Sequence, residues 1–215
     1  MNFVMKLNCK FFKWRIFLRA ICIISAVYLS SCHSYTEEQM EPVSSGTARN
    51  VSIMSYGKAN TAQLENYFLK NNPSVNRSYL NKVTSAYLKE ASYEGVNSDV
   101  AFVQMCHETN FLRFGNQVKQ YQNNFAGIGA TDDGAKGAAF KTIDEGIRAQ
   151  IQHLKAYASR AKLNGRCVDP RFGEVKRGSA VYVSQLGSGK WASDPNYAKK
   201  LLYKINELYR INGIN

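Results

Sequence analysis

A single glutamate, Glu108, has the surroundings that acid catalysis requires. It lies in an apolar stretch and is followed by Phe111, Leu112 and Phe114. Cleavage of a glycosidic bond needs a carboxylic acid that stays protonated near neutral pH, and a partly apolar setting favours the protonated form. Gln104 lies one turn earlier, on the same face of the expected helix, and is a candidate to contact a ligand. The alternative is a solvated glutamate near a helix end, with no chemical role.

A second set of polar side chains falls on one face of a later helix. Gln150, His153 and Tyr157 are three and four residues apart, and their face is offset from the apolar stripe. We expect Gln150 and His153 to contact a ligand in a cleft or to pair with the backbone of that cleft. The alternative for His153 is a hydrogen-bonded structural role.

The histidines do not indicate a metal site. The chain contains three of them, His33, His107 and His153. The pair His107-Glu108 begins like a zinc-protease pattern, but that pattern needs a second histidine four residues after the first, and position 111 is phenylalanine. No glycine-rich phosphate loop follows a strand. We therefore expect neither a metal nor another cofactor.

The elements that must position these residues are mainly helices, because apolar residues recur at helical spacing after residue 60. Capping and stop signals set their ends. The first three expected helices run from Asn60 to before Pro73, from about Leu80 to Gly95, and from about Asp99 to Asn110 after a cap at Asn97 or Ser98. The next two run from Thr142 to Ala158 and from Ser179 to Leu186. The last begins at Asp194, with Pro195 at the first helical position. Glu108 then lies near the C-terminal end of the third.

The segment from Gly115 to Phe140 has a different pattern. Glycines interrupt its short apolar pieces, which predicts a loop-rich lobe with one small hairpin. Asp132 and Asp133 lie on a glycine-flanked turn within it. The expected fold class is therefore mainly α, with a small irregular β lobe inserted after the third helix.

The N-terminus indicates export. Five basic residues precede an apolar run from Ala20 to Ser31, which is too short to span a bilayer comfortably. The quartet Leu29-Ser30-Ser31-Cys32 resembles the lipobox of bacterial lipoproteins, in which the cysteine is diacylated and the chain is cleaved before it. We expect residues 1–31 to be a signal peptide and Cys32 to anchor the protein to a membrane of the cell envelope. An uncleaved anchor or an ordinary secretory cleavage are the alternatives.

The rest of the chain divides into a tether and one domain. Residues 32–58 show no sustained apolar period and are expected to be flexible, and residues 59–215 form the domain. The chain has 28 Lys and Arg against 16 Asp and Glu. A basic surface outside the cytoplasm suits an anionic polymer such as the cell wall better than nucleic acid. Besides Cys32, the cysteines after the leader are Cys106 and Cys167, either bridged or as two buried thiols.

Four ordered blocks of the domain match one known family. They are residues 104–112 (QMCHETNFL), 122–129 (QNNFAGIG), 149–157 (AQIQHLKAY) and 191–198 (WASDPNYA). Together they resemble the bacterial glucosaminidases, the peptidoglycan hydrolases of glycoside hydrolase family seventy-three. The resemblance covers about residues 60 to 211 and implies a lysozyme-like α+β fold.

The resemblance also implies roles for individual residues. Glu108 matches the general acid of the family, Asn124 and Phe125 match the loop motif that lines its cleft, and Tyr197 matches its active-site tyrosine. Aromatic faces suit sugar rings, so Phe125, Tyr197 and Trp191 are candidate platforms, with core packing as the alternative.

The second carboxylate is less defined. The family often places it in the lobe after the loop motif, where this chain has Asp132 and Asp133. Either is a candidate to hold the water or to stabilise an oxocarbenium-like centre, while Asp-Gly is also a common turn signal.

The sequence thus predicts a monomeric, lipid-anchored endo-β-N-acetylglucosaminidase that acts on peptidoglycan glycan strands with Glu108 as general acid. A lytic transglycosylase is a second interpretation, because it needs one acid and uses a hydroxyl of the sugar as the nucleophile. A catalytically silent peptidoglycan-binding lipoprotein is the third.

Overall fold

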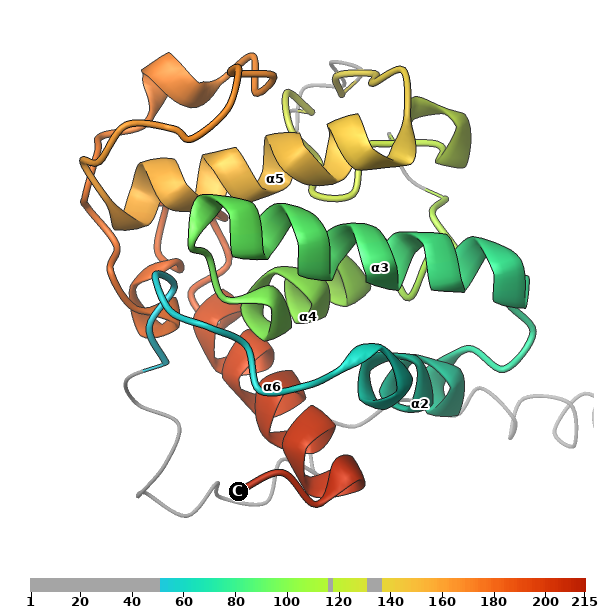
Figure 1. Cartoon of the computed structure of the whole chain (residues 1–215). Coiled ribbons are helices and arrows are strands. Elements are labelled where there is room, and N and C mark those ends of the chain that lie inside the picture. Colours follow the sequence, from blue (N-terminus) through green and yellow to red (C-terminus); the bar gives the residue numbers. More distant parts are fainter. Residues whose placement is uncertain (1–50, 116–117, 131–136) are drawn as a thin grey trace, which may run out of the picture. The chain divides into compact units, whose positions relative to one another are not determined.

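The computed structural model describes residues 51–115, 118–130 and 137–215. These residues form α-helices joined by loops (Figure 1): α2 (Thr61–Asn71), α3 (Arg77–Glu94), α4 (Ser98–Glu108), α5 (Ile143–Ala158) and α6 (Tyr197–Asn212). Within them, the β-structure is limited to an isolated bridge between Ser52 and Tyr182. The mainly helical prediction is confirmed. The small β lobe is not confirmed, since the described residues between α4 and α5 form loops and a 3₁₀ turn at Gln120–Gln122.

α2 begins at its predicted cap, and α3 ends at its predicted stop, although α3 begins at Arg77, three residues before the predicted start at about Leu80. Before α2, the Asn60 side chain accepts a hydrogen bond from the Gln63 amide, and the Gln63 side chain accepts one from the Asn60 amide, both at 3.0 Å. α3 ends at Gly95, whose φ of 74° is left-handed. Glycine adopts this conformation without steric cost.

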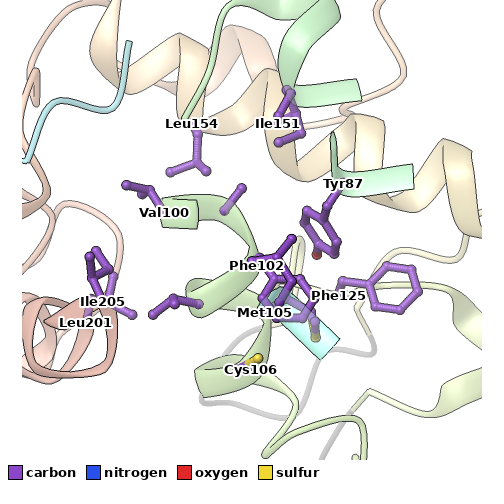
Figure 2. Close-up of a cluster of buried hydrophobic side chains, with 14 of the residues drawn as sticks. Tyr87, Val100, Phe102, Met105, Cys106, Phe125, Ile151, Leu154, Leu201 and Ile205 are labelled. Carbon is purple, nitrogen blue, oxygen red and sulfur yellow. The ribbon is translucent and has the colours of Figure 1, made fainter. Parts of the chain in front are cut away.

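α4 is the central helix. Every residue from Ser98 to Cys106 is buried, and α4 contacts α2, α3, α5 and α6. Figure 2 shows Phe102 and Met105 among core side chains from the neighbouring helices. Because α4 is enclosed on all sides, packing fixes its position and holds its C-terminal residue, Glu108, at the edge of the core.

α3 and α5 lie side by side (Figure 1), and charged side chains join them as well as apolar ones. Lys155 Nζ lies 2.7 Å from a carboxylate oxygen of Glu94, with side chains only 4% and 0% exposed. Arg148 forms a second pair with the buried Glu90, at 2.7 Å. A buried pair of this kind is strongly destabilising to break, because one charge is then left without a partner.

The cap of α5 differs in one detail from the capping box that the spacing of Thr142 and Glu145 predicts. The Thr142 hydroxyl accepts from the Glu145 amide at 3.1 Å, as expected. The Glu145 carboxylate, however, accepts from the amide of Lys141 at 2.8 Å, one residue earlier than a capping box requires.

Two predicted helix positions are wrong. The segment from Ser179 to Leu186 contains only a 3₁₀ turn, Val183–Gln185. Its backbone pairs with the N-terminal segment instead. The Ile53 amide donates to the Val181 carbonyl at 3.0 Å, and the Val183 amide donates to the Val51 carbonyl at 2.9 Å. α6 begins at Tyr197 rather than at Pro195, because the Asp194 side chain accepts from the Asn196 amide in a turn before the helix.

The expected tether is also too long at its C-terminal end. Ile53 is fully buried in the core, and the Lys58 amide donates to the Asp99 carboxylate at 2.6 Å. Residues 51–58 therefore pack with the domain. The expected leader, Cys32 and the remainder of the tether lie outside the described residues. No helix in the described part of the chain is long and apolar enough to cross a membrane.

The cysteine alternatives are partly resolved. Cys106 and Cys167 are both free thiols, so the disulfide between them is excluded. Only Cys106 is buried, and Cys167 is exposed.

Candidate active site

Glu108 is the last residue of α4, and the chain reverses direction directly after it. Asn110, Phe111 and Leu112 have φ values of 49°, 55° and 57°, a left-handed turn without glycine. Such backbone costs roughly 1–2 kcal/mol per residue. The turn is held because the Phe111 amide donates to the Cys106 carbonyl at 2.8 Å and the Leu112 amide donates to the Thr109 hydroxyl at 2.9 Å. Strained backbone of this kind is concentrated at functional sites.

Two aromatic residues from the end of the chain converge on Glu108. The hydroxyl of Tyr197, the first residue of α6, donates to Oε1 of Glu108 at 2.5 Å. The indole Nε1 of Trp191 donates to the same oxygen at 3.0 Å. The structure therefore brings together the first and the last of the four sequence blocks, with their polar groups in direct contact.

The surroundings of Glu108 favour its protonated form. Protein atoms enclose the carboxyl group on most sides, although the residue remains exposed at the mouth of a pocket. Burial raises the pKa of Glu108, the hydrogen bonds from Tyr197 and Trp191 lower it, and the net pKa is raised. The neighbouring His107 is neutral at pH 7, because burial and the charges of Lys204 and Lys200 lower its pKa to about 4.

The pocket at Glu108 has a volume of about 720 Å³, within the range of small-molecule sites. An adjoining pocket of about 270 Å³ is lined by His153, Tyr157, Arg171 and Lys190, among others. The two pockets share Trp191 and the backbone around Gly127 as lining. Together they form a groove that extends past Trp191, which suits a chain of rings better than a single small ligand.

Asn124 organises the loop that forms one wall of the groove. Its Nδ2 donates to the carbonyls of Ile128 at 2.9 Å and Ala138 at 3.0 Å, and its Oδ1 accepts from the Ile128 amide at 3.0 Å. The residue is 1% exposed. The side-chain amide thus replaces a strand ladder in holding this lobe. Asn124 also lines the pocket at Glu108, as predicted, and its contact with substrate stays a prediction.

Phe125 does not serve as a platform for sugar rings. It is fully buried, and Figure 2 shows it near Tyr87. Its ring lies 6.5 Å from that of Tyr87 and 6.4 Å from that of Phe114. The prediction that it lines the cleft is wrong, because the loop turns this side chain into the core.

Gln104 and Gln150 are likewise not open to the groove. Both are fully buried, and they bond to each other where α4 and α5 meet, with Gln150 Nε2 donating to Gln104 Oε1 at 2.9 Å. Their predicted contact with substrate is corrected accordingly. Gln104 Nε2 donates to the hydroxyl of Tyr197 at 2.9 Å, and Gln150 Oε1 accepts from the hydroxyl of Tyr87. Sequence reasoning missed Tyr87, which belongs to an apolar helical stripe and carries no signal of its own.

His153 reaches the adjoining pocket. Its Nδ1 lies 2.7 Å from a carboxylate oxygen of Asp169, whose side chain is fully buried, and its ring meets that of Trp191 edge-on at 5.0 Å. His153 therefore has the hydrogen-bonded structural role at one ring nitrogen, and the residue also lines the groove. Asp169 was not predicted, because it comes 16 residues later in a loop with no periodic pattern.

Asp132 and Asp133 lie outside the described residues. Ala130, the last described residue before them, lines both pockets. Among the described residues that line the pocket around Glu108, Glu108 is the only carboxylate. No group of three His, Cys, Asp or Glu side chains in the described ranges converges as metal ligands would.

Comparison with known proteins agrees with this geometry. Residues 84–210 match the family Glucosaminidase, described as mannosyl-glycoprotein endo-beta-N-acetylglucosaminidase. An uncharacterized protein of Borreliella burgdorferi is 46% identical over 163 residues, which are 76% of this chain and 79% of that protein. The family match runs from α3 to α6 and includes Glu108, Trp191 and Tyr197. The chain therefore belongs to the glucosaminidase family.

Proposed function

We propose that this protein is an endo-β-N-acetylglucosaminidase that hydrolyses the glycan strands of peptidoglycan, with Glu108 as the general acid. Membership of the family supports a glycosidase activity of the peptidoglycan type in general. The observation that carries the specific proposal is the placement of Glu108, whose raised pKa, two hydrogen-bond donors and open pocket coincide at one carboxyl group.

In the proposed reaction Glu108 gives its proton to the glycosidic oxygen next to N-acetylglucosamine. The raised pKa keeps the proton available near neutral pH. Once the proton has left, the carboxylate is negative, and the donors Tyr197 and Trp191 stabilise that charge. The same two residues thus favour the product side of the proton transfer.

The sugar chain would lie along the groove on both sides of Trp191. The indole ring is a candidate platform for a sugar face, and its N–H is already directed to Glu108. His153 and the cations Arg171 and Lys190 line the adjoining pocket and would meet hydroxyl and carboxylate groups of the strand.

Asp133 or Asp132 is proposed to assist the attacking water. Support comes from chain position, because Ala130 lines both pockets directly before this pair. If hydrolysis needs this carboxylate, the Asp132→Asn/Asp133→Asn double variant loses turnover and keeps binding to the wall.

The central test replaces Glu108 by glutamine, which keeps the shape and removes the acid. Glu108→Gln is expected to fold and to reduce the release of new reducing ends from purified peptidoglycan by about 10²–10⁴-fold. Glu207→Gln on α6, which removes a partly exposed carboxylate elsewhere, is the matched control and should retain activity. Full activity in Glu108→Gln would refute the assignment.

A lytic transglycosylase is the second candidate, favoured by the presence of a single carboxylate among the described residues that line the pocket. Mass analysis of the products separates the two reactions, because only a transglycosylase leaves anhydro-muramyl ends. Binding without any turnover would identify the protein as a silent wall-binding member of the family.

We further propose that the protein is exported and anchored through a lipid on Cys32. This rests on the basic run, the short apolar run and the Leu29-Ser30-Ser31-Cys32 quartet, which lie outside the described residues. It would place the enzyme at the cell envelope, beside its proposed substrate.

A further inference from the structure

A buried chain of hydrogen bonds connects Glu108 with the centre of the core. Tyr87 Oη donates to Gln150 Oε1 at 2.5 Å, and Gln150 Nε2 donates to Gln104 Oε1 at 2.9 Å. Gln104 Nε2 donates to Tyr197 Oη at 2.9 Å, and Tyr197 Oη donates to Glu108 Oε1 at 2.5 Å. Tyr87, Gln150 and Gln104 are 0% exposed, and Tyr197 is 3% exposed. The chain therefore links α3, α5, α4 and α6 without contact with solvent before Glu108.

The backbone carbonyl of Ala101 sets the direction of this chain. A carbonyl can only accept, and Gln150 Nε2 donates to it at 3.0 Å. With the amide of Gln150 reversed, two oxygens would face each other in a buried place, which is unfavourable. The nitrogen of Gln150 must therefore face α4, so that Gln104 presents its oxygen to Gln150 and its nitrogen to Tyr197.

This direction determines where the proton of Tyr197 points. A tyrosine hydroxyl has one proton, and its oxygen already accepts from Gln104. The proton is thus directed to Oε1 of Glu108, which also accepts from Trp191 Nε1. A proton on Oε1 would face two donors, so the protonated acid carries it on the other oxygen, Oε2.

We propose that Gln104 and Gln150 are positioning residues that hold the Tyr197 hydroxyl as a donor to Oε1 of Glu108, so that Oε2 carries the proton that is transferred. The inference rests on the proposed role of Glu108 as general acid. In the reaction the O–H bond at Oε2 breaks as the bond to the glycosidic oxygen forms. The electron pair stays on the carboxylate, and the two donors at Oε1 stabilise it.

Each link also strengthens the next. A hydroxyl or amide that accepts a hydrogen bond becomes a better donor, by about 10–30% per bond. All four bonds run toward Glu108. Loss of Gln104 therefore weakens the hydrogen bond from Tyr197 to Glu108, even though both of these side chains remain.

Other ionisable groups near Glu108 set the background for a titration. His107 on α4 faces Tyr197 at 5.4 Å between ring centroids, and burial with nearby lysines lowers its pKa to about 4. On α6, Lys200 is paired with Asp194 at 2.8 Å. Behind Trp191, His153 is paired with Asp169. None of these groups is a member of the chain, so a change in the chain leaves them in place.

The test measures the pKa of Glu108 directly, by NMR of the protein labelled with carbon-13 at the glutamate carboxyl groups, with Glu108→Gln for assignment. Gln104→Met keeps the length of the side chain and removes its hydrogen bonds. We expect it to raise the pKa of Glu108, and Tyr197→Phe to raise it further. In the Tyr197→Phe background, Gln104→Met should have no additional effect, because Gln104 acts through Tyr197. On peptidoglycan, Gln104→Met should lower kcat about tenfold through misorientation of the acid.

The control is Thr84→Val, which removes a buried hydroxyl on α3 that bonds within its own helix and to Glu65. It should lower stability and leave the pKa of Glu108 unchanged. An unchanged pKa in folded Gln104→Met, or an additive shift in the double variant, would overturn the proposal. If Gln104→Met does not fold, Gln150→Met tests the same chain one link further away. We expect it to raise the pKa of Glu108 by a smaller amount, and an unchanged pKa would count against the proposal. Because the titration needs no substrate, a shifted pKa in a protein without glycosidase activity would reject the proposed function and retain only the part of the inference in which the two glutamines orient the Tyr197 hydroxyl toward Glu108.

Discussion

Protein atoms replace part of the water around the carboxyl group of Glu108. When the group is charged, this burial lowers the free energy of unfolding. Burial raises its pKa above the ordinary value of 4.5, so the folded chain binds the proton more tightly than the unfolded chain. The stabilisation from this tighter binding is complete below pH 4.5 and is lost as the pH rises through the folded pKa.

This sign predicts a trade-off between stability and activity. Glu108→Gln keeps an oxygen that can accept from Tyr197 and Trp191 but carries no charge at any pH. Relative to the wild type, its free energy of unfolding should increase as the pH rises from 4 to 7, and it should be the more stable protein at pH 7. Urea unfolding at several pH values measures the difference. A wild type that gains stability relative to Glu108→Gln over this interval would contradict the raised pKa.

Single residues also show how far sequence patterns reach. The order of the four blocks anticipates that Glu108, Trp191 and Tyr197 meet, and they do. The spacing places Gln104 and Gln150 on the correct helical faces, yet it cannot tell whether another helix covers those faces. α4 and α5 cover each other there, so both glutamines are buried: Gln150 bonds to Gln104, and Gln104 bonds to Tyr197 instead of a ligand.

At the level of elements, boundaries set by neighbouring residues were predicted and boundaries set by distant ones were not. The Asn60 cap and the Gly95 end depend on a few adjacent residues and are confirmed. The expected helix at Ser179–Leu186 is absent, because its backbone pairs with residues 51–53 more than 120 positions earlier. No local pattern contains that contact.

The contact between α5 and the groove loop gives an element-scale prediction. Gly146 lies in the first turn of α5, and a Cβ added to it would come within 1.7 Å of the Asn123 carbonyl oxygen. Because that oxygen belongs to the backbone, it cannot move without the loop. We expect Gly146→Ala to displace the loop that Asn124 organises, with activity reduced about 10²-fold and stability lowered by about 1–3 kcal/mol.

The matched control for this substitution is Gly173→Ala. A Cβ at Gly173 would meet no atom within 4 Å, and its φ is not in the left-handed region. Turnover of peptidoglycan and thermal unfolding should both stay close to the wild type in this variant. Equal activity in Gly146→Ala and Gly173→Ala would show that the loop is not held to α5 by this close approach.

For the whole molecule, two features of the sequence favour attachment to the envelope, and they act by different physics. The net charge of +12, which becomes +7 once the five basic residues of the expected leader are removed, gives electrostatic attraction to anionic surfaces, which salt screens. A diacylated Cys32 would give hydrophobic insertion, which salt does not weaken, because each buried methylene contributes about 0.8 kcal/mol. The two can therefore be separated by changing one cysteine and the ionic strength.

Expressed in a bacterial host, the wild-type chain is expected to enter the detergent phase in a phase-separation assay at both low and high salt, and to carry a mass increment on Cys32. Cys32→Ala behind an ordinary secretory leader, which is cleaved without acylation, should enter the aqueous phase once salt is raised, since only charge would then hold it to membranes. Cys22→Ala, within the apolar run of the leader, is the control and should behave as the wild type. Because residues 51–215 supply the fold around Glu108, the released Cys32→Ala protein should keep its activity on soluble glycan fragments. Detergent partition of Cys32→Ala at high salt would mean that something other than acylation of this cysteine anchors the chain.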